Sequence, residues 1–159
     1  MLIRDLMTPD PVVVRPETPV EAIAGQLLAH RINGVPVVDE GRRLLGVVTA
    51  ADLIHRAADE RLEPRESVWK ENFWISFLNP EGARPGKAEG RTAAEVMTRK
   101  VHNVAPDDHP LVAARLMADY HLTSLPVVEA DTVIGVISRI DLLRRLHELE
   151  NPNPLQRNS

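Results

Sequence analysis

The residues best suited to chemistry are a hydroxyl and a carboxylate three positions apart, a pair that occurs twice. Thr49 is followed by Asp52, and Ser138 is followed by Asp141. A carboxylate can accept hydrogen bonds from two hydroxyl groups, and a hydrogen bond to a charged group is worth roughly 1.5–3 kcal/mol. The same spacing at a helix start is close to a capping box, which satisfies free backbone N–H groups. Ligand binding and helix capping both remain open, because one hydroxyl–acid pair can do both.

The surroundings of the two pairs are also alike. The hydroxyl residue of each pair is the last residue of an apolar run that begins with glycine. These runs are Gly46-Val47-Val48-Thr49 and Gly135-Val136-Ile137-Ser138. We expect a helix to begin directly after each hydroxyl residue. The free N–H groups at such a helix start favour an anion such as a phosphate.

These two runs belong to a longer internal repeat. Met7-Thr8 recurs as Met97-Thr98, and Val35-Pro36-Val37-Val38 recurs as Leu125-Pro126-Val127-Val128, each at an offset of 90 residues. The glycine-led runs recur at an offset of 89, so the second copy lacks one residue of the preceding turn. Turns tolerate such deletions best.

Each copy predicts the order strand, helix, strand, strand, helix. In the first copy, Thr18 is the expected helix N-cap, followed by Pro19 at the first helical position and Glu21 as the capping-box partner. Apolar side chains then recur at helical spacing. The expected elements of copy one are a strand over 12–14, a helix from 18, strands over 35–39 and 44–49, and a helix after 49. Those of copy two are 101–104, 108–120, 124–129, 133–138 and 139–148.

A repeat of about 50 residues is too small to bury much surface alone. We therefore expect two βαββα repeats to pack as a pseudo-twofold pair around a shared core, with clefts where they meet. The expected division is repeat 1 over 1–57, a helical insert and linker over 58–91, repeat 2 over 92–149 and a disordered tail over 150–159.

The duplicated segments resemble the CBS domain family in its tandem form, the Bateman module. Three features carry the resemblance: the Met-Thr pair, the apolar-Pro-Val-Val strand and the Gly-apolar-x-apolar-Ser/Thr-x-x-Asp segment. All three occur in both copies in the same order. The resemblance implies an α/β fold of the α+β-like CBS kind over roughly Leu2–Ala57 and Thr92–Glu148.

The resemblance also implies a function, the binding of a regulatory adenosine-containing ligand such as AMP, ADP, ATP or S-adenosylmethionine. Asp52 and Asp141 would accept the ribose hydroxyls, and Thr49 and Ser138 would lie near the ribose or phosphate. The base would rest on apolar walls and backbone groups. The residues expected there are Thr8, Val12, Val13 and Val35 in copy one, and Thr98, His102, Asn103 and Leu125 in copy two. For the valines and the leucine, plain core packing is the competing interpretation.

One departure from the family pattern concerns the phosphate. Nucleotide-binding relatives often carry basic residues just before the second strand, where this chain has the uncharged Asn33-Gly34 and Thr123-Ser124. His121 and Arg139 are the nearest candidates for a phosphate contact, although Arg139 could also be a solvated surface residue. Ala50 stands at the place of Arg139 in copy one. We expect two unequal sites, with the one around Asp141 the better for anions.

Composition and motifs weigh against other functions. The chain has no cysteine and a net charge of −4, with no basic stripe for nucleic acid. The histidines show no His-x-x-x-His spacing, and there is no Gly-x-Ser-x-Gly elbow or Gly-rich loop with lysine. We therefore expect no enzyme activity, no metal and no cofactor. No apolar run approaches 18 residues and no secretory leader is visible, which favours a cytoplasmic location.

The insert predicts an interaction surface. Trp69, Phe73 and Phe77 recur at helical spacing, with Trp74 beside them, and together they are four of the five aromatic residues in the chain. This stripe either covers the protein's own core or joins subunits, since aromatic residues are enriched at interfaces. The family resemblance implies a homodimer arranged as a four-repeat disc. The alternative function is a ligand-free structural or protein-interaction module that uses this aromatic helix, with a partner that the sequence does not identify.

Overall fold

A computed structural model describes the backbone of residues 1–54 and 91–150. The contacts group these residues into two compact units. Unit 1 contains Met1–Pro11, Arg42–Leu44 and the described residues from His102 onward. Unit 2 contains Val12–Gly41 and the described residues between Leu45 and Val101. Each unit therefore takes most of its residues from one repeat and a short leading segment from the other.

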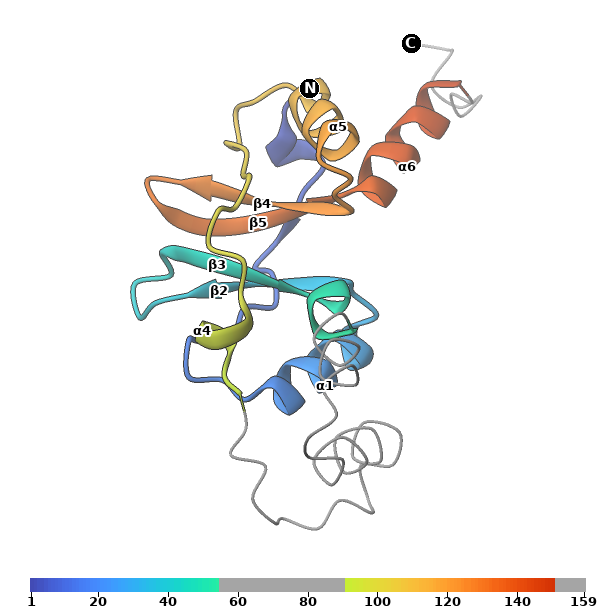
Figure 1. Cartoon of the computed structure of the whole chain (residues 1–159). Helices are drawn as coiled ribbons and strands as arrows, with labels where there is room; N and C mark the ends of the chain where they lie inside the picture. The colour runs from blue at the N-terminus through green and yellow to red at the C-terminus, as the bar shows by residue number, and fades with distance from the viewer. Residues whose placement is uncertain (55–90, 151–159) are drawn as a thin grey trace. The chain divides into compact units, whose positions relative to one another are not determined.

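Unit 2 is built on repeat 1 (Figure 1). Its elements are α1 (Val20–His30), the paired strands β2 (Gly34–Val38) and β3 (Leu44–Thr49), and the short helix α4 (Ala93–Val96). A further helix begins at Ala50 and is described as far as Ile54. The core lies where the apolar face of α1 packs on the sheet. Its fully buried residues include Ile23, Val35, Val37, Val48 and Ala93.

Unit 1 is built on repeat 2. Its elements are η1 (Ile3–Asp5), β1 (Thr8–Pro9), α5 (Pro110–Asp119), β4 (Ser124–Glu129), β5 (Thr132–Ser138) and α6 (Arg139–Glu150). The strands form an antiparallel sheet in the order β1-β5-β4. Alternate residues of β5 are buried, as expected for a strand with one face on a core. That core includes Ile3, Val104, Ala113, Leu125, Val127 and Ile137.

The two leading segments are exchanged between the repeats. In unit 1, Thr8 of β1 pairs with Val136 of β5. In unit 2, Val47 of β3 and Thr98 each donate a backbone N–H to the other's carbonyl, at 3.0 and 2.9 Å. The leading segment of repeat 1 thus completes the sheet of repeat 2, and the leading segment of repeat 2 extends the sheet of repeat 1.

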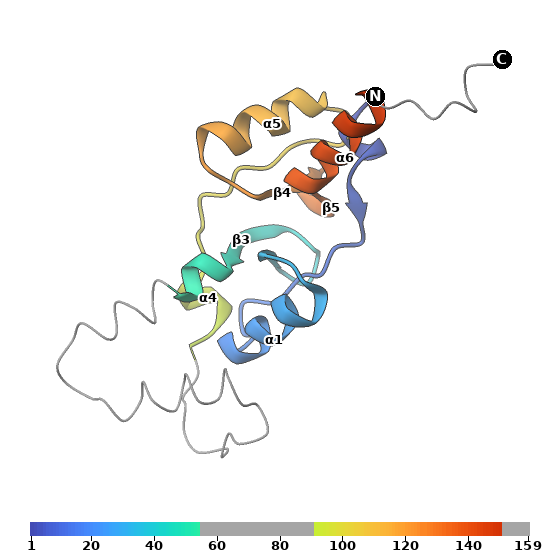
Figure 2. The ribbon, with the colours of Figure 1, turned by 90° about the vertical axis from the view of Figure 1, so that its right-hand side faces the viewer.

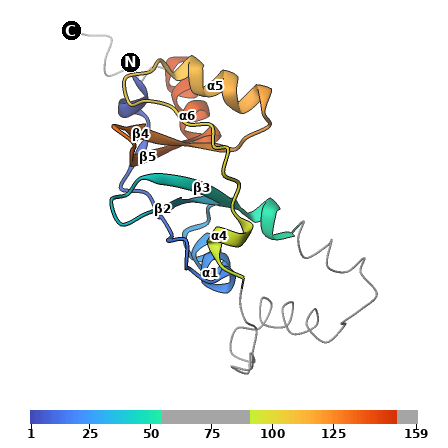
Figure 3. The same cartoon turned by 60° about the vertical axis from the view of Figure 1, so that its left-hand side comes forward.

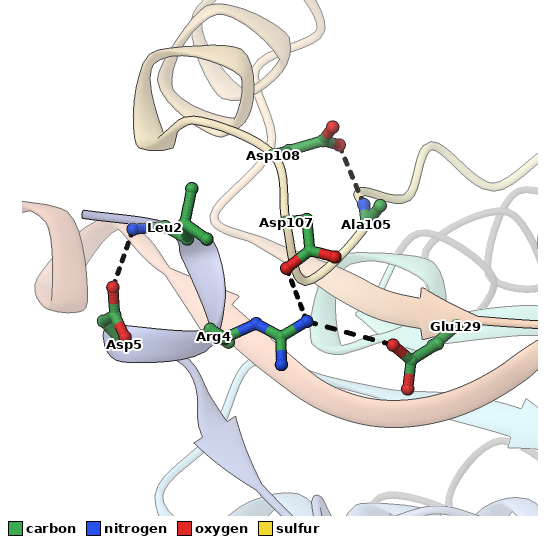
Figure 4. A network of polar contacts seen from close by, with 7 residues as sticks. All are labelled: Leu2, Arg4, Asp5, Ala105, Asp107, Asp108 and Glu129. Carbon is green, nitrogen blue, oxygen red and sulfur yellow. Dashed lines mark hydrogen bonds and ion pairs between the residues drawn. The ribbon is translucent and has the colours of Figure 1, made fainter.

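A polar network also binds the N-terminal segment to unit 1 (Figure 4). The guanidinium of Arg4 donates to the carboxylate of Asp107 and lies 4.0 Å from that of Glu129. Backbone N–H groups of Ile3 and Arg4 donate to the carbonyls of Asp108 and Pro106, at 3.0 and 2.9 Å. Because the ion pair is exposed, these backbone bonds and the burial of Ile3 supply most of the attachment.

The predicted starts of the first helix in each repeat were wrong by one or two residues, for one reason. The Thr18 hydroxyl accepts the N–H of Arg15, and the Asp108 carboxylate accepts that of Ala105, so each side chain caps the preceding turn. The helices begin later, at Val20 and Pro110. The expected strands over 12–14 and 101–104 shrink to single parallel bridges, Val14 to Val37 and Val104 to Val127.

The expected strands over 44–49 and 124–129 are confirmed. The remaining strands and helices lie within a few residues of their expected bounds. The aromatic residues of the insert and the tail after 150 lie outside the described residues. None of the helices in the described ranges is long and apolar enough to cross a lipid bilayer.

Candidate functional site

In unit 1, Ser138 and Asp141 form a closed hydrogen-bonded pair where β5 passes into α6. The Oδ2 atom of Asp141 accepts the backbone N–H of Ser138 at 2.8 Å and its hydroxyl at 2.7 Å. The side chain of Asp141 is only 12% exposed, and its Oδ1 atom lies 3.8 Å from the exposed guanidinium of Arg144. One carboxylate oxygen is therefore committed to the helix start, while the other has only this long, solvated ion pair.

In unit 2, Thr49 and Asp52 repeat the backbone bonds of this arrangement, since the Ser138 hydroxyl likewise accepts the N–H of Asp141 at 3.3 Å. Asp52 accepts the backbone N–H of Thr49 at 2.9 Å, and the Thr49 hydroxyl accepts the N–H of Asp52 at 3.1 Å. These reciprocal bonds are a capping box. In both repeats the structure thus confirms the capping interpretation, and the capping bonds use only the Oδ2 atom of each aspartate.

The residue that follows each hydroxyl residue donates its backbone N–H to the turn before the first of the two paired strands, β4 in unit 1 and β2 in unit 2. The N–H of Arg139 donates to the carbonyl of Thr123 at 3.0 Å, as that of Ala50 does to Asn33 at 2.8 Å. The Nε atom of Arg139 also donates to the carbonyl of Leu122 at 2.8 Å. Within the described residues, the two terminal guanidinium nitrogens of Arg139 have no partner. The guanidinium is thus held in place with its two terminal nitrogens available to an anion.

His121 and its counterpart Arg31 lie in these same turns, between the first helix of each repeat and the strand that follows it. Each follows the helix of its repeat and has a left-handed backbone, with φ of 54° and 53° respectively. Both side chains are exposed. Sequence reasoning selected His121 and overlooked Arg31, although the 90-residue offset that relates the copies leads directly from one to the other.

The residues expected to hold a base divide into three groups. Val35 and Leu125 are 0% and 1% exposed, so their side chains form core and offer no surface for stacking. This corrects the expectation that they line a ligand wall. Val12 and Val13 are half-buried, and Asn103 is exposed.

His102 has an aromatic neighbour that the sequence did not indicate. Its imidazole stacks on the ring of Tyr120, with ring centroids 3.8 Å apart and planes 24° from parallel. One face of the imidazole is therefore already covered. A base that approached His102 would have to use the other face or displace Tyr120.

Thr8 and Thr98 each pair with a strand of the other repeat. In sequence Thr8 belongs to repeat 1 and Thr98 to repeat 2, but Thr8 pairs with β5 in unit 1 and Thr98 pairs with Val47 in unit 2. The exchange of leading segments is the physical reason. Each threonine is therefore associated with the opposite acid, Thr8 with the unit of Asp141 and Thr98 with the unit of Asp52.

The protein thus has two α+β units, each with a hydroxyl–acid pair at the start of the helix that follows its two paired strands. The family model for the CBS domain matches residues 3–59 and 93–148. The chain therefore belongs to the CBS domain family, and its two matched segments make it a tandem CBS pair.

Individual proteins agree with this assignment. The chloroplastic CBS domain-containing protein CBSX2 of Arabidopsis thaliana is 30% identical over 151 residues, which cover 88% of this chain and 61% of CBSX2. The chain spans from 22% to 61% of the length of the first four curated relatives.

Solved structures give the same fold. A crystal structure of CBSX2 in complex with AMP superimposes with a TM-score of 0.70, at 27% identity and with coverage of 94% of this chain and 98% of the other. The CBS domain pair of protein MJ0100, in complex with 5′-methylthioadenosine and S-adenosyl-L-methionine, gives a TM-score of 0.71 at 23% identity, covering 94% and 98%. The second likeness concerns the fold alone.

Proposed function

We propose that this chain is a regulatory module that binds an adenosine-containing ligand, with AMP the first candidate. The observation that supports it most directly is the pair Ser138 and Asp141, which holds a poorly exposed carboxylate at a helix start with one oxygen still lightly engaged. Such an oxygen can accept a ribose hydroxyl. The complex of CBSX2 with AMP supports the choice of ligand.

The two repeats would differ in what they bind. Beside Asp141, the anchored Arg139 offers two guanidinium nitrogens to a phosphate. Thr123 and Ser124, which directly follow the Leu122 that anchors this guanidinium, carry hydroxyl groups. Beside Asp52, Ala50 offers only a methyl group. We expect a phosphorylated ligand to prefer the unit 1 site over the unit 2 site for this reason.

The test is a thermal-shift titration of the wild type, Asp52→Asn and Asp141→Asn with AMP, ADP, ATP, S-adenosylmethionine and NAD. Asparagine keeps one oxygen to accept the capping N–H but removes the charge, which separates ligand binding from helix capping. A ligand at a hundredfold excess over its Kd should stabilise the wild type by about 2.7 kcal/mol. Asp141→Asn should lose most of this effect for AMP.

Two results would contradict the proposal. One is that no ligand raises the Tm of the wild type. The other is that both asparagine variants keep the full shift. A variant with a lower Tm in the absence of ligand but an unchanged ligand shift would assign its aspartate to capping alone.

We also propose that the chain forms a homodimer. In this proposal the dimer regulates another protein and does not itself catalyse a reaction. Support comes from the large apolar side chains that the described residues leave exposed, including Leu111, Tyr120 and Leu143. Sedimentation velocity on the wild type tests this proposal, and a monomer at micromolar concentration would overturn it.

A further inference from the structure

The sulfur chemistry of this chain rests on methionine alone. The sequence has no cysteine and four methionines, at positions 1, 7, 97 and 117. A thioether reacts with peroxides to give a sulfoxide, which turns a flexible apolar side chain into a polar one. The consequence for the protein depends on two properties of each sulfur, namely its access to solvent and the groups against which it packs.

Two of the four methionines combine access with packing. Met1 is 52% exposed, whereas Met117 is 3% exposed in the core of unit 1. Met7 and Met97 lie between these extremes, since each is half-buried and packs against the core of its own unit. Oxidation of Met1 would disturb no packing, and an oxidant would not reach Met117 in the folded protein. Met7 and Met97 are therefore the methionines at which an oxidant can act on the folded structure.

Met7 and Met97 make the same contact, one in each unit. A Cβ atom on Gly135 would lie 2.6 Å from the sulfur of Met7, and one on Gly46 would lie 2.7 Å from the sulfur of Met97. The carbonyl oxygen of the threonine that follows each methionine lies 3.0 and 2.8 Å from the same two points. A sulfoxide oxygen directed at the glycine would collide with this backbone. One directed at water would draw the side chain away from the strand, because a polar S–O group is costly to bury without a hydrogen bond.

This contact fastens the exchanged leading segments to their sheets. The segment that carries β1 runs along β5 (Figure 2), and the segment that follows α4 runs along β3 (Figure 3). The backbone pairing is short, with two residue pairs between β1 and β5 and one bridge between Val47 and Thr98. Short pairings depend on the packing of their side chains. Loss of the methionine contact should therefore loosen the pairing as well.

We propose that Met7 and Met97 form a paired oxidation site, at which a peroxide converts each thioether to a sulfoxide and loosens the leading segment from its sheet. The sulfur loses two electrons and gains one oxygen atom from the peroxide, and hydrogen peroxide leaves as water. A methionine sulfoxide reductase supplied with a thiol reverses the step, with the sulfur reduced and the thiol oxidised to a disulfide. The site makes the exchange of leading segments responsive to oxidants.

Graded oxidation of the wild type with hydrogen peroxide tests the proposal. Peptide mass spectrometry follows each methionine, and thermal unfolding follows the fold. Met7 and Met97 should be oxidised after Met1 and well before Met117. As their sulfoxides accumulate, the Tm should fall by at least about 4 °C. Treatment with methionine sulfoxide reductases and dithiothreitol should restore it.

Leucine variants assign the effect to the two sulfurs. M7L/M97L keeps a similar apolar volume without the thioethers, so the same peroxide treatment should leave its Tm unchanged. M117L is the matched control, and peroxide should lower its Tm as it lowers that of the wild type. M7L/M97L retains Trp69 and Trp74, so a peroxide-induced loss that persists in this variant would assign the effect to other groups and overturn the proposal.

Hydrogen exchange locates the change within each unit. In M7L, peroxide should speed the exchange of the amides of Val47 and Thr98, which donate to each other's carbonyls. In M97L, it should instead speed exchange in β1 and β5 and leave that of Val47 unchanged. The oxidised wild type should show both changes without any substitution.

Two further results would count against the proposal. One is that Met7 and Met97 in the folded wild type are oxidised no faster than Met117. The other is complete conversion of both residues to sulfoxides with the Tm and the exchange of Val47 unaltered.

Discussion

The sulfur of Met97 lies against the backbone of Gly46, so closely that a Cβ atom on this glycine would come within 2.7 Å of it. The carbonyl oxygen of Thr98 would lie 2.8 Å from this added Cβ atom. The first contact joins the Met-Thr pair of one repeat to the glycine-led strand of the other. Met7 and Gly135 form the same contact in unit 1, where the corresponding distance is 2.6 Å. Packing therefore requires glycine at these positions within β3 and β5.

Gly46→Ala should destabilise the protein by about 1–3 kcal/mol, the usual effect of overfilling a packed site. The backbone carbonyl of Thr98 blocks the added methyl group as well, so shortening Met97 to alanine should restore only part of the loss. Chemical denaturation measures both effects.

Gly25→Ala is the matched control for that substitution. Nothing lies within 4 Å of a Cβ atom at Gly25, which is on the exposed side of α1. The change should stabilise the protein by about 0.5–1 kcal/mol, because alanine is the better helix former. Equal effects of the two glycine substitutions would contradict the close contact at Gly46.

Two neighbouring residues separate burial from charge in the N-terminal segment. Ile3→Ala should lower the free energy of unfolding by about 2–5 kcal/mol, since Ile3 is 0% exposed in the core of unit 1. Arg4→Ala should lower it by less than about 1 kcal/mol, because the ion pair of Arg4 with Asp107 is largely in solvent. Urea unfolding of both variants checks this order, and the reverse order would show that the ion pair anchors the segment.

Arg139→Ala and Ala50→Arg exchange the one residue that most clearly distinguishes the two hydroxyl–acid sites. Arg139→Ala should weaken AMP binding by about tenfold, since it removes charge-assisted hydrogen bonds to the phosphate. Binding of adenosine should be nearly unchanged, and calorimetric titration of both ligands provides the comparison.

Ala50→Arg should strengthen AMP binding at the unit 2 site, because the carbonyl of Asn33 already holds the backbone of residue 50 as that of Thr123 holds Arg139.

An equal loss of AMP and adenosine binding in Arg139→Ala would assign Arg139 to the structure of the turn.

His109 is an unusual N-cap that can be improved. Its Nδ1 atom accepts the N–H of Leu111 at 3.2 Å, and Pro110 occupies the first helical position of α5. Aspartate and asparagine are among the strongest N-caps, and an acid also suits the positive end of the helix dipole. His109→Asp should therefore raise the Tm, with a gain of up to about 1 kcal/mol in the free energy of unfolding, and His109→Ala should lower it. A lower Tm for His109→Asp would show that His109 has a role beyond capping.

Much of the fold could be predicted because the chain repeats itself. The strands over 44–49 and 124–129 follow from short apolar runs bounded by polar turns, and these patterns are local. The helix starts were less accessible, because Thr18 and Asp108 are good capping residues for either of two adjacent turns. The choice between those turns depends on backbone geometry that composition does not encode.

The site could be predicted only in part. The pairs Thr49–Asp52 and Ser138–Asp141 are local in sequence, so their spacing was sufficient to find them. The exchange that moves Thr8 and Thr98 depends on contacts across about 50 to 130 residues, which neither propensity nor spacing reveals. The stack of His102 on Tyr120 is likewise a tertiary contact.

The exchange of leading segments means that a repeat of this chain is not a separable part. A gene fragment that encodes residues 92–149 would lack Ile3 and β1, and one that encodes residues 1–57 would lack Ala93 and the partner of Val47. A substitution at Gly135 has to be compensated at Met7, and one at Gly46 at Met97, although the two residues of each pair come from different repeats. The duplicated halves are therefore free to diverge at Ala50 and Arg139, but each must keep the contacts on which the other depends.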